Sequence, residues 1–84
     1  MHHTLKLDKK YWHSVASGTK PFEVRLNDRN YKQGDTITFI DSYSHCLLMP
    51  NMVFRITYIL KHSEFKEGIQ DGYCLFAIAP IEEV

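Results

Sequence analysis

The sequence predicts an α+β domain that is mainly β, a small and strongly curved β-barrel of about five strands with one N-terminal amphipathic helix. Four segments alternate apolar and polar residues or are rich in β-branched residues, as strands are, and a fifth is a short continuous apolar run, as in a buried strand. A single segment, near the N-terminus, has the apolar spacing of a helix. A chain of 84 residues supports one hydrophobic core, so we expect one domain over residues 1–84.

The chain is expected to start with a short strand and then the helix. Residues 3–7, HTLKL, place every second side chain on one buried face. Asp8 can cap a helix over residues 9–17, and Gly18 can end it with a left-handed turn. The apolar side of this helix, which would lie on the sheet, consists of Tyr11, Trp12, Val15 and Ala16.

The second strand, residues 20–26, has charged residues at alternate positions. Phe22 and Val24 are expected to face the core, and Glu23 and Arg25 to face the opposite way. A solvated strand face is one interpretation of this charged pair, and a functional site is the other.

Three more strands are expected. TITFI, residues 36–40, is rich in β-branched residues. MVFRITYIL, residues 52–60, is the most strongly β segment and is predicted to be central, and YCLFAIAPI, residues 73–81, is predicted to be the last buried strand. In residues 52–60 the alternation predicts one face made of Phe54, Ile56, Tyr58 and Leu60.

The connections between these strands differ in character. Residues 41–51 form a predicted loop in which Leu47, Leu48 and Met49 act as a partly buried plug or a contact surface. Residues 61–72 form a polar connection with room for one helical turn. Closing the sheet into a barrel would remove its exposed edges, and a split α+β sheet is the alternative architecture.

The net charge is zero, which excludes proteins that hold nucleic acid by a large excess of positive charge. The charges are unevenly distributed, however. Residues 1–32 carry seven basic and three acidic side chains, whereas residues 33–84 carry three basic and seven acidic ones. An anionic ligand is therefore expected to meet the N-terminal third.

No segment approaches the roughly 20 apolar residues of a membrane helix. The N-terminal segment lacks the apolar centre of a signal peptide, so we expect a cytoplasmic protein with Cys46 and Cys74 as reduced thiols. The histidines and cysteines lack the spacings of zinc sites, and neither a phosphate-binding glycine loop nor a dinucleotide fingerprint is present. We expect no metal and no cofactor.

The segment after the helix contains the string Gly-x-Lys-x-x-Glu-x-Arg, filled by Gly18, Lys20, Glu23 and Arg25. This string resembles the mark of the ASCH domain, a member of the PUA-like superfamily of small β-barrels. The chain is also similar to a small uncharacterised ASCH-like family of phage and bacterial genomes. The matching positions span nearly the whole chain: His3, Leu5, Lys6, Lys20–Arg25, Asn27–Arg29, Gly34, Asp35, Ile56–Leu60, Gly72 and Tyr73.

The resemblance implies a PUA-like barrel with a cleft between the barrel and the helix, and with the motif residues at its floor or rim. ASCH domains are proposed to bind RNA, so RNA or a nucleotide is the implied partner. A small bacterial ASCH protein of similar architecture is an amidohydrolase that acts on acetylated cytidine. In that enzyme the motif lysine aids catalysis, and a threonine stands at the position of Glu23.

The side chains themselves indicate how such a site would work. Glu23 and Arg25 point the same way along a strand, and Asn27 and Arg29 would continue the row. A carboxylate, an amide and two guanidiniums can read a base edge and hold a phosphate. Lys20 can contact a phosphate or, with a pKa lowered by burial, act as a general base. The alternative is a set of surface ion pairs of little energetic weight.

Aromatic residues and one histidine complete the set of candidates. His3 is expected to face the same cleft as Glu23. Tyr73 and Tyr31 have glycine or polar neighbours and are expected to be exposed rings on which a base can stack. Trp12 is expected in the core.

Three functions are open at this point. An amidohydrolase for an acylated nucleoside would use Lys20 and Glu23 as acid–base groups. A phage or bacterial interaction module would use residues 45–52, HCLLMPNM, as a contact patch, and the motif would only hold the fold. An RNA- or nucleotide-binding module, which we prefer, would line its cleft with Lys20, Glu23, Arg25, Asn27 and Arg29, with Tyr73 and His3 nearby.

Overall fold

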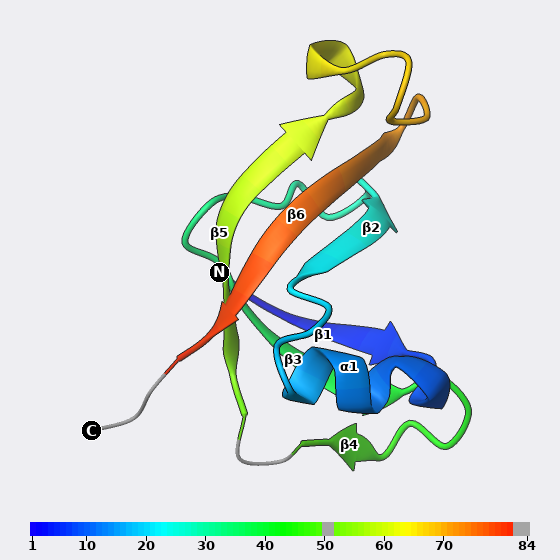
Figure 1. Ribbon diagram of the computed structural model, residues 1–84, viewed down its shortest axis with the longest axis vertical. Helices are drawn as coiled ribbons and strands as arrows, with labels where there is room; N and C mark the ends of the chain where they lie inside the picture. The colour runs from blue at the N-terminus through cyan, green and yellow to red at the C-terminus, as the bar shows by residue number, and fades with distance from the viewer. Residues whose placement is uncertain (50–51, 82–84) are drawn as a thin grey trace.

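A strongly curled sheet wraps around one hydrophobic core in the computed structural model, which describes residues 1–49 and 52–81 (Figure 1). The strands are β1 His2–Leu7, β2 Phe22–Leu26, β3 Thr36–Asp41, β4 Leu47–Leu48, β5 Phe54–Lys61 and β6 Tyr73–Pro80. The five longer strands lie in the order β1-β3-β5-β6-β2, and the two-residue β4 pairs with β3. β1 and β3 are parallel, and the other pairs are antiparallel.

The sheet is a half-barrel whose two end strands are β1 and β2. Within the described part of the chain, no strand ladder joins these two ends. The prediction of a small, mainly β domain with five principal strands and one short helix is therefore confirmed, while the backbone ladder stops short of a closed barrel. The open side between β1 and β2 is where the charged motif lies.

The predicted helix forms as a 3₁₀ turn, Lys9–Tyr11, followed by α1, Trp12–Ala16. The Asp8 side chain caps the turn by accepting a hydrogen bond from the Lys10 backbone N–H at 3.0 Å. Gly18 adopts a φ of 81° just after the helix, as a left-handed ending requires. Val15 is buried, and Trp12 and Ala16 pack against the core, as predicted.

Tyr11 departs from the predicted apolar helix face and is substantially exposed. It belongs to the 3₁₀ turn, in which successive side chains are spaced at three residues per turn and not 3.6. This change of period rotates the Tyr11 ring away from the core side and toward β2, where it borders the candidate site.

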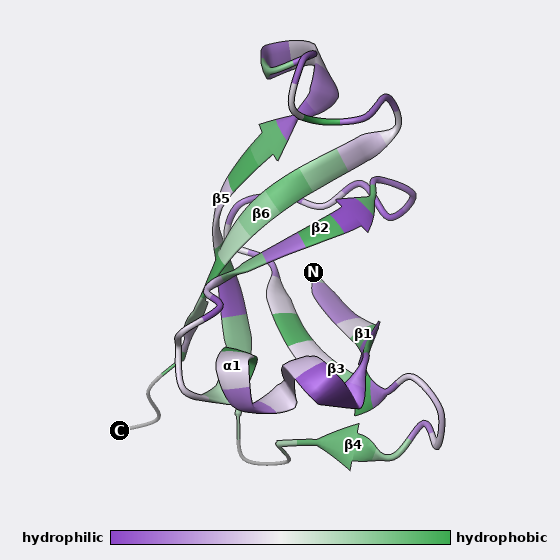
Figure 2. Ribbon diagram, turned by 45° about the vertical axis from the view of Figure 1, so that its right-hand side comes forward, coloured by the Kyte–Doolittle hydropathy of each residue, from purple (hydrophilic) through white to green (hydrophobic). Residues whose placement is uncertain are grey.

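The predicted orientation of β2 is wrong. Glu23 is only 4% exposed, whereas Phe22 and Val24 are 42% and 53% exposed. In the antiparallel pairing with β6, Glu23 lies opposite the buried Phe76, and directly opposed residues share a face. Arg25 likewise lies opposite Cys74, which is buried. In Figure 2, β2 alternates between hydrophobic and hydrophilic colours along its length. The burial of Glu23 shows that the hydrophilic residues are the inward ones.

β5 is a central strand, as predicted, but it does not keep one face throughout. The register against β6 shifts between Ile56 and Tyr58, which places a bulge at Thr57. Phe54 and Ile56 are buried before the bulge, and Ile59 packs against the core after it. Tyr58 is therefore exposed, contrary to the alternation expected from residues 52–60.

The connections agree in part with the predictions. The polar segment after β5 holds one 3₁₀ turn, His62–Glu64, before β6 begins. In the loop after β3, Met49 is buried and Leu48 packs on the core, while Leu47 is exposed. Pro50 and Asn51 of the predicted contact patch lie outside the described residues.

The facing of β2 and β6 can be tested with two phenylalanines. Phe76→Ala is expected to lower the free energy of unfolding by about 3–5 kcal/mol, because Phe76 is fully buried and its loss leaves a cavity. Phe22→Ala removes the same atoms from the exposed face and is expected to cost less than about 1 kcal/mol. Urea unfolding measures both values. A larger loss for Phe22→Ala would show that β2 faces the other way.

Candidate functional site

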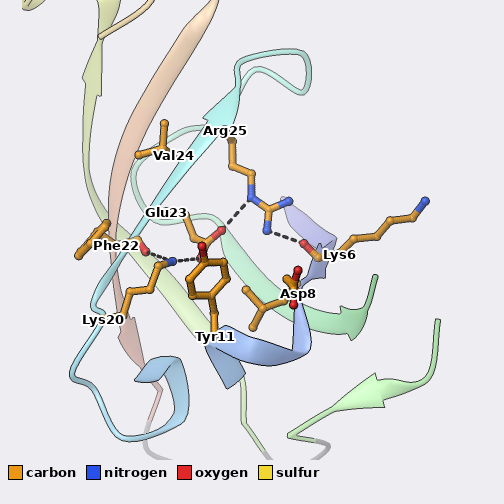
Figure 3. Close-up of a pocket in the computed structure, with 9 residues that line it drawn as sticks. Lys6, Asp8, Tyr11, Lys20, Phe22, Glu23, Val24 and Arg25 are labelled. Carbon is orange, nitrogen blue, oxygen red and sulfur yellow. Dashed lines mark hydrogen bonds and ion pairs between the residues drawn. The ribbon is translucent and has the colours of Figure 1, made fainter. Parts of the chain in front are cut away.

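The inward row of β2 forms an ion cluster around one carboxylate, drawn in Figure 3. Oε1 of Glu23 accepts a hydrogen bond from Nζ of Lys20 at 2.8 Å, and Oε2 accepts one from Nε of Arg25 at 2.8 Å. The Glu23 side chain is buried, while those of Lys20 and Arg25 are about one-fifth exposed. Two cations thus compensate one buried anion, and the cluster keeps a net positive charge.

Lys20 is positioned by the turn that ends the helix. Its backbone N–H donates to the Ser14 carbonyl at 2.8 Å, which fixes the start of the approach to β2. Its Nζ also donates to the Phe22 carbonyl at 3.1 Å. The ammonium lies 5.1 Å from the ring centroids of both Tyr11 and Phe22, within the range of a cation–π contact.

Two arginines cross the open side of the half-barrel. Nη2 of Arg25 donates to the Lys6 carbonyl at 2.6 Å, and Nη1 of Arg29 donates to the Thr4 carbonyl at 3.0 Å. Both acceptors belong to β1, whose other edge pairs with β3. Side-chain hydrogen bonds therefore connect β1 to the β2 side of the sheet, where no backbone ladder does.

A pocket of about 330 Å³ opens beside this cluster, between the end of β1, the 3₁₀ turn and β2 (Figure 3). Its lining carries three cations against two carboxylates, together with two aromatic rings. The lining residues are Lys6, Leu7, Asp8, Tyr11, Lys20, Phe22, Glu23, Val24 and Arg25.

The sequence-based candidates divide into two groups. Lys20, Glu23 and Arg25 line the pocket together, whereas Arg29 contacts β1 further along the open side. Oδ1 of Asn27 is buried without a hydrogen-bond partner among the described residues. Tyr73 lies opposite Leu26, so it is on the outer face of the sheet and not on the face that carries Glu23.

His3 is buried away from the pocket lining in a small polar cluster of its own. Its Nε2 is 2.8 Å from Oδ2 of Asp35, and its ring meets the edge of Tyr31 with centroids 4.7 Å apart. The expectation that Tyr31 is an exposed stacking ring is wrong, because Tyr31 is buried and also packs on Phe76. This burial raises the pKa of the Tyr31 hydroxyl.

Asp35 owes its low pKa to the same cluster. Burial by itself would raise the pKa of this carboxyl, but hydrogen bonds from His3, from the Lys32 backbone N–H and from the Met1 amino group outweigh burial and lower it. The His3–Asp35 pair therefore joins β1 to the start of β3 and has a structural role.

Four residues that line the pocket are not among the site residues expected from the sequence: Lys6, Asp8, Tyr11 and Phe22. Lys6 follows the first alternating residues of the chain, but its proximity to β2 depends on the curl of the sheet. Tyr11 reaches the pocket because of the 3₁₀ turn, and periodicity at 3.6 residues per turn assigns it to the core.

Other kinds of site find little support in the described ranges, 1–49 and 52–81. They contain no group of three or more His, Cys, Asp or Glu side chains placed to hold a metal ion. Cys46 is exposed and Cys74 is buried, and both are free. Among these residues, no helix is long and apolar enough to cross a membrane.

The fold and the site define a small β domain with a charged pocket at its open strand edge. Residues 2–78 match the family described as a domain of unknown function, DUF3850, and the chain belongs to this family. A stretch of 35 residues is 49% identical to an uncharacterized 12.9 kDa protein in the GpA 3′ region of Escherichia phage P2. That match covers 42% of this chain and 32% of the phage protein.

Two solved structures share the fold. The crystal structure of hypothetical protein PH0355 superposes with a TM-score of 0.65 at 21% identity, over 96% of this chain and 100% of that one. The solution NMR structure of protein PF0455 from Pyrococcus furiosus gives a TM-score of 0.55 at 18% identity, over 99% and 100% of the two chains. At these identities the similarity concerns the fold alone.

The buried charge cluster leads to a stability prediction. Glu23→Gln is expected to lower the free energy of unfolding by about 1–3 kcal/mol, because Lys20 and Arg25 then share a partly buried space without a counter-charge. Glu67→Gln, a matched change at an exposed position, is expected to stay within about 0.5 kcal/mol of the wild type. Equal effects of the two changes in urea unfolding would contradict the cluster.

Asp35 leads to a pH prediction. Its pKa in the folded chain is lower than the ordinary 3.8, so its ionisation stabilises the fold fully above that value. The stabilisation is lost as the pH falls through the lower, folded-state pKa. The stability difference between wild type and Asp35→Asn should therefore shrink in acid, as measured by thermal unfolding across this range. Glu67→Gln, at an exposed position, serves as the control.

Proposed function

We propose that this chain is a PUA-like, ASCH-type module that binds RNA or a nucleotide in the pocket lined by Lys20, Glu23 and Arg25. The observation that supports the proposal best is the position of these three motif residues, side by side at the mouth of a pocket on the open side of the sheet. The resemblance of the motif to that of ASCH domains, which are proposed to bind RNA, points to the same ligand class.

The size of the pocket favours a single nucleotide unit. Small-molecule pockets have volumes of roughly 300–1,000 Å³. A pocket of about 330 Å³ is at the lower end of this range and suits one base with its sugar or phosphate. A strand of RNA would then insert one unpaired nucleotide and run along the surface on either side.

The available donors favour a ligand that offers acceptor atoms. Both Glu23 oxygens are engaged by Lys20 and Arg25, so the carboxylate holds the two cations in place. The ammonium has three N–H groups and the guanidinium five, and the bonds described above use two of each. The remaining donors suit phosphate oxygens or the carbonyl and ring nitrogen acceptors of a base.

A ring at the rim supplies the apolar part of such a site. Tyr11 is 40% exposed and lines the pocket. Aromatic faces stack on bases irrespective of base identity. The excess of basic side chains in residues 1–32, together with Lys6 in the lining, would attract the phosphate backbone.

An amidohydrolase is the second candidate, favoured by the 2.8 Å contact between the Lys20 ammonium and the Glu23 carboxylate. The ammonium of such a pair can deliver its proton to a leaving group, and the pair that has lost this proton can take one from water. An acylated nucleoside of the size described above would be the substrate.

The proposal predicts a localised NMR response. Titration of isotope-labelled chain with a short structured RNA, and separately with cytidine and N4-acetylcytidine, should shift the amides of Tyr11, Lys20, Glu23 and Arg25. Lys20→Met should weaken binding at least about tenfold by removing a phosphate or base contact. Lys32→Met removes the same charge from an exposed position outside the pocket and serves as the matched control.

The outcomes separate the candidates. Shifts at the pocket without chemical change support a binding module, and affinity for RNA should then fall as salt rises. Free acetate in the N4-acetylcytidine sample would make the chain an amidohydrolase. Absence of shifts with all three probes, or equal weakening by both lysine variants, would overturn the nucleotide site.

A further inference from the structure

The segment around β2 is chemically symmetric about Val24. It reads KPFEVRLND from Lys20 to Asp28. Lys20 and Asp28 are equidistant from Val24 and have opposite charges, as have Glu23 and Arg25. Phe22 and Leu26 form the remaining outer pair, and both are apolar. A strand with this pattern is complementary to an antiparallel copy of itself.

The backbone of β2 is oriented as such pairing requires. Ile78 N–H donates to the Pro21 carbonyl and Asn27 N–H donates to the Gly72 carbonyl, so the odd-numbered residues of β2 exchange hydrogen bonds with β6. The N–H and C=O groups of Phe22, Val24 and Leu26 therefore point to the opposite edge. β2 is the end strand of the sheet, and along this edge it has no strand partner among the described residues.

The outer face of β2 is open to solvent, since Phe22, Val24 and Leu26 are 42%, 53% and 50% exposed. On the edge itself, the Phe22 carbonyl accepts a hydrogen bond from Nζ of Lys20 at 3.1 Å and keeps a second lone pair for a further donor. In Figure 3, the Val24 side chain points away from the pocket face that carries Glu23 and Arg25. Three alternate residues of this edge strand have outward apolar side chains, and an unpaired edge strand of this kind is prone to pair with another strand.

We propose that two copies of the chain pair antiparallel along β2, about a two-fold axis at Val24. In this register Val24 faces Val24 of the second copy as a hydrogen-bonded pair, and Phe22 faces Leu26 of the second copy. Such a contact is isologous, with the same surface used on both sides, so it closes at two copies.

Charge complementarity selects a second copy over an unrelated strand. On the inner face, Glu23 stands opposite Arg25 of the second copy, which extends the ion pair already present within each chain. Lys20 stands opposite Asp28 of the second copy just beyond the strand ends. A register shifted by two residues would place Glu23 opposite Glu23 or Arg25 opposite Arg25, and like charges directly opposed are unfavourable. The net charge of zero adds no overall repulsion.

The outer face supplies the apolar part of the contact. Tyr73, Leu75 and Ala77 of β6 lie opposite the three exposed residues of β2 and face the same side. Pairing at the edge would make this apolar surface continuous between the two copies. The second copy would lie on the side of β2 where the pocket opens, since Phe22 and Val24 line the pocket, so a bound ligand and the second copy would share this space.

Sedimentation of the full chain over a wide concentration range tests the assembly. The wild type is expected to reach a monomer–dimer equilibrium, and Val24→Lys, which opposes two charges on the axis, should raise the dissociation constant at least about tenfold. Tyr58→Lys places the same charge on the exposed outer face of β5, away from the edge, and should leave dimerisation unchanged. Circular dichroism verifies that both variants fold. A wild type that stays monomeric, or equal disruption by both variants, would overturn the proposal.

Disulfide trapping tests the register independently. In a Cys46→Ser background, Val24→Cys should form a crosslinked dimer on mild oxidation, because the two Cα atoms would be about 5.5 Å apart, within disulfide range. Leu26→Cys alone should not crosslink, since the two positions would be about 13 Å apart. Leu26→Cys mixed with Phe22→Cys should give the mixed dimer. Efficient crosslinking of Leu26→Cys with itself would contradict the axis at Val24.

Discussion

The arrangement of this domain depends on a buried carboxylate. Glu23 lies on the core side of β2 between Lys20 and Arg25, and each of its oxygens accepts one charge-assisted hydrogen bond. A carboxylate is costly to bury alone and is tolerated where cations satisfy it. The two cations thus allow the charged side chains of β2 to face the core and its apolar side chains to face outward. In most strands the apolar side chains face the core instead.

This reversal places the charged groups where the backbone leaves the sheet open. β1 and β2 end the half-barrel without pairing, and Arg25 and Arg29 reach from the β2 side to carbonyls of β1. The same guanidinium that completes the fold also borders the pocket. Structural and ligand-binding roles are therefore compatible in this motif, because Arg25 has more donors than the fold consumes. The outward apolar row in turn leaves an edge that favours self-association.

The sequence predicts well those elements in which burial follows hydrophobicity. In β1, alternating apolar side chains identify the strand and its buried face, and in β6 a continuous apolar run identifies the strand. Asp8 and Gly18 mark the limits of the helical segment. In β2, the alternation defines two faces but does not tell which of them faces the core. That depends on the register with β6, which places Glu23 opposite Phe76. The bulge at Thr57 likewise changes the facing of β5 without any local signal in the sequence.

The candidate site was also predicted only in part, because some of its contacts depend on strand pairing and not on local sequence. Lys20, Glu23 and Arg25 are recognisable from a short local string, and the structure brings them together. Tyr73 and His3 were expected near the same cleft, but strand register places Tyr73 on the other face and the bond to Asp35 draws His3 into the core. Contacts that depend on the curl of the sheet, such as that between Arg25 and the Lys6 carbonyl, do not follow from local sequence.

The most direct test of the buried Glu23 cluster is an NMR measurement on the Arg25 side chain. We expect a slowly exchanging Arg25 Nε–H, because it is bonded to the buried Glu23 carboxylate, with nuclear Overhauser effects from the guanidinium to backbone protons of Lys6 and Leu7. A rapidly exchanging Nε–H, with contacts instead to the side chains of Val24 and Leu75 on the outer face, would contradict it.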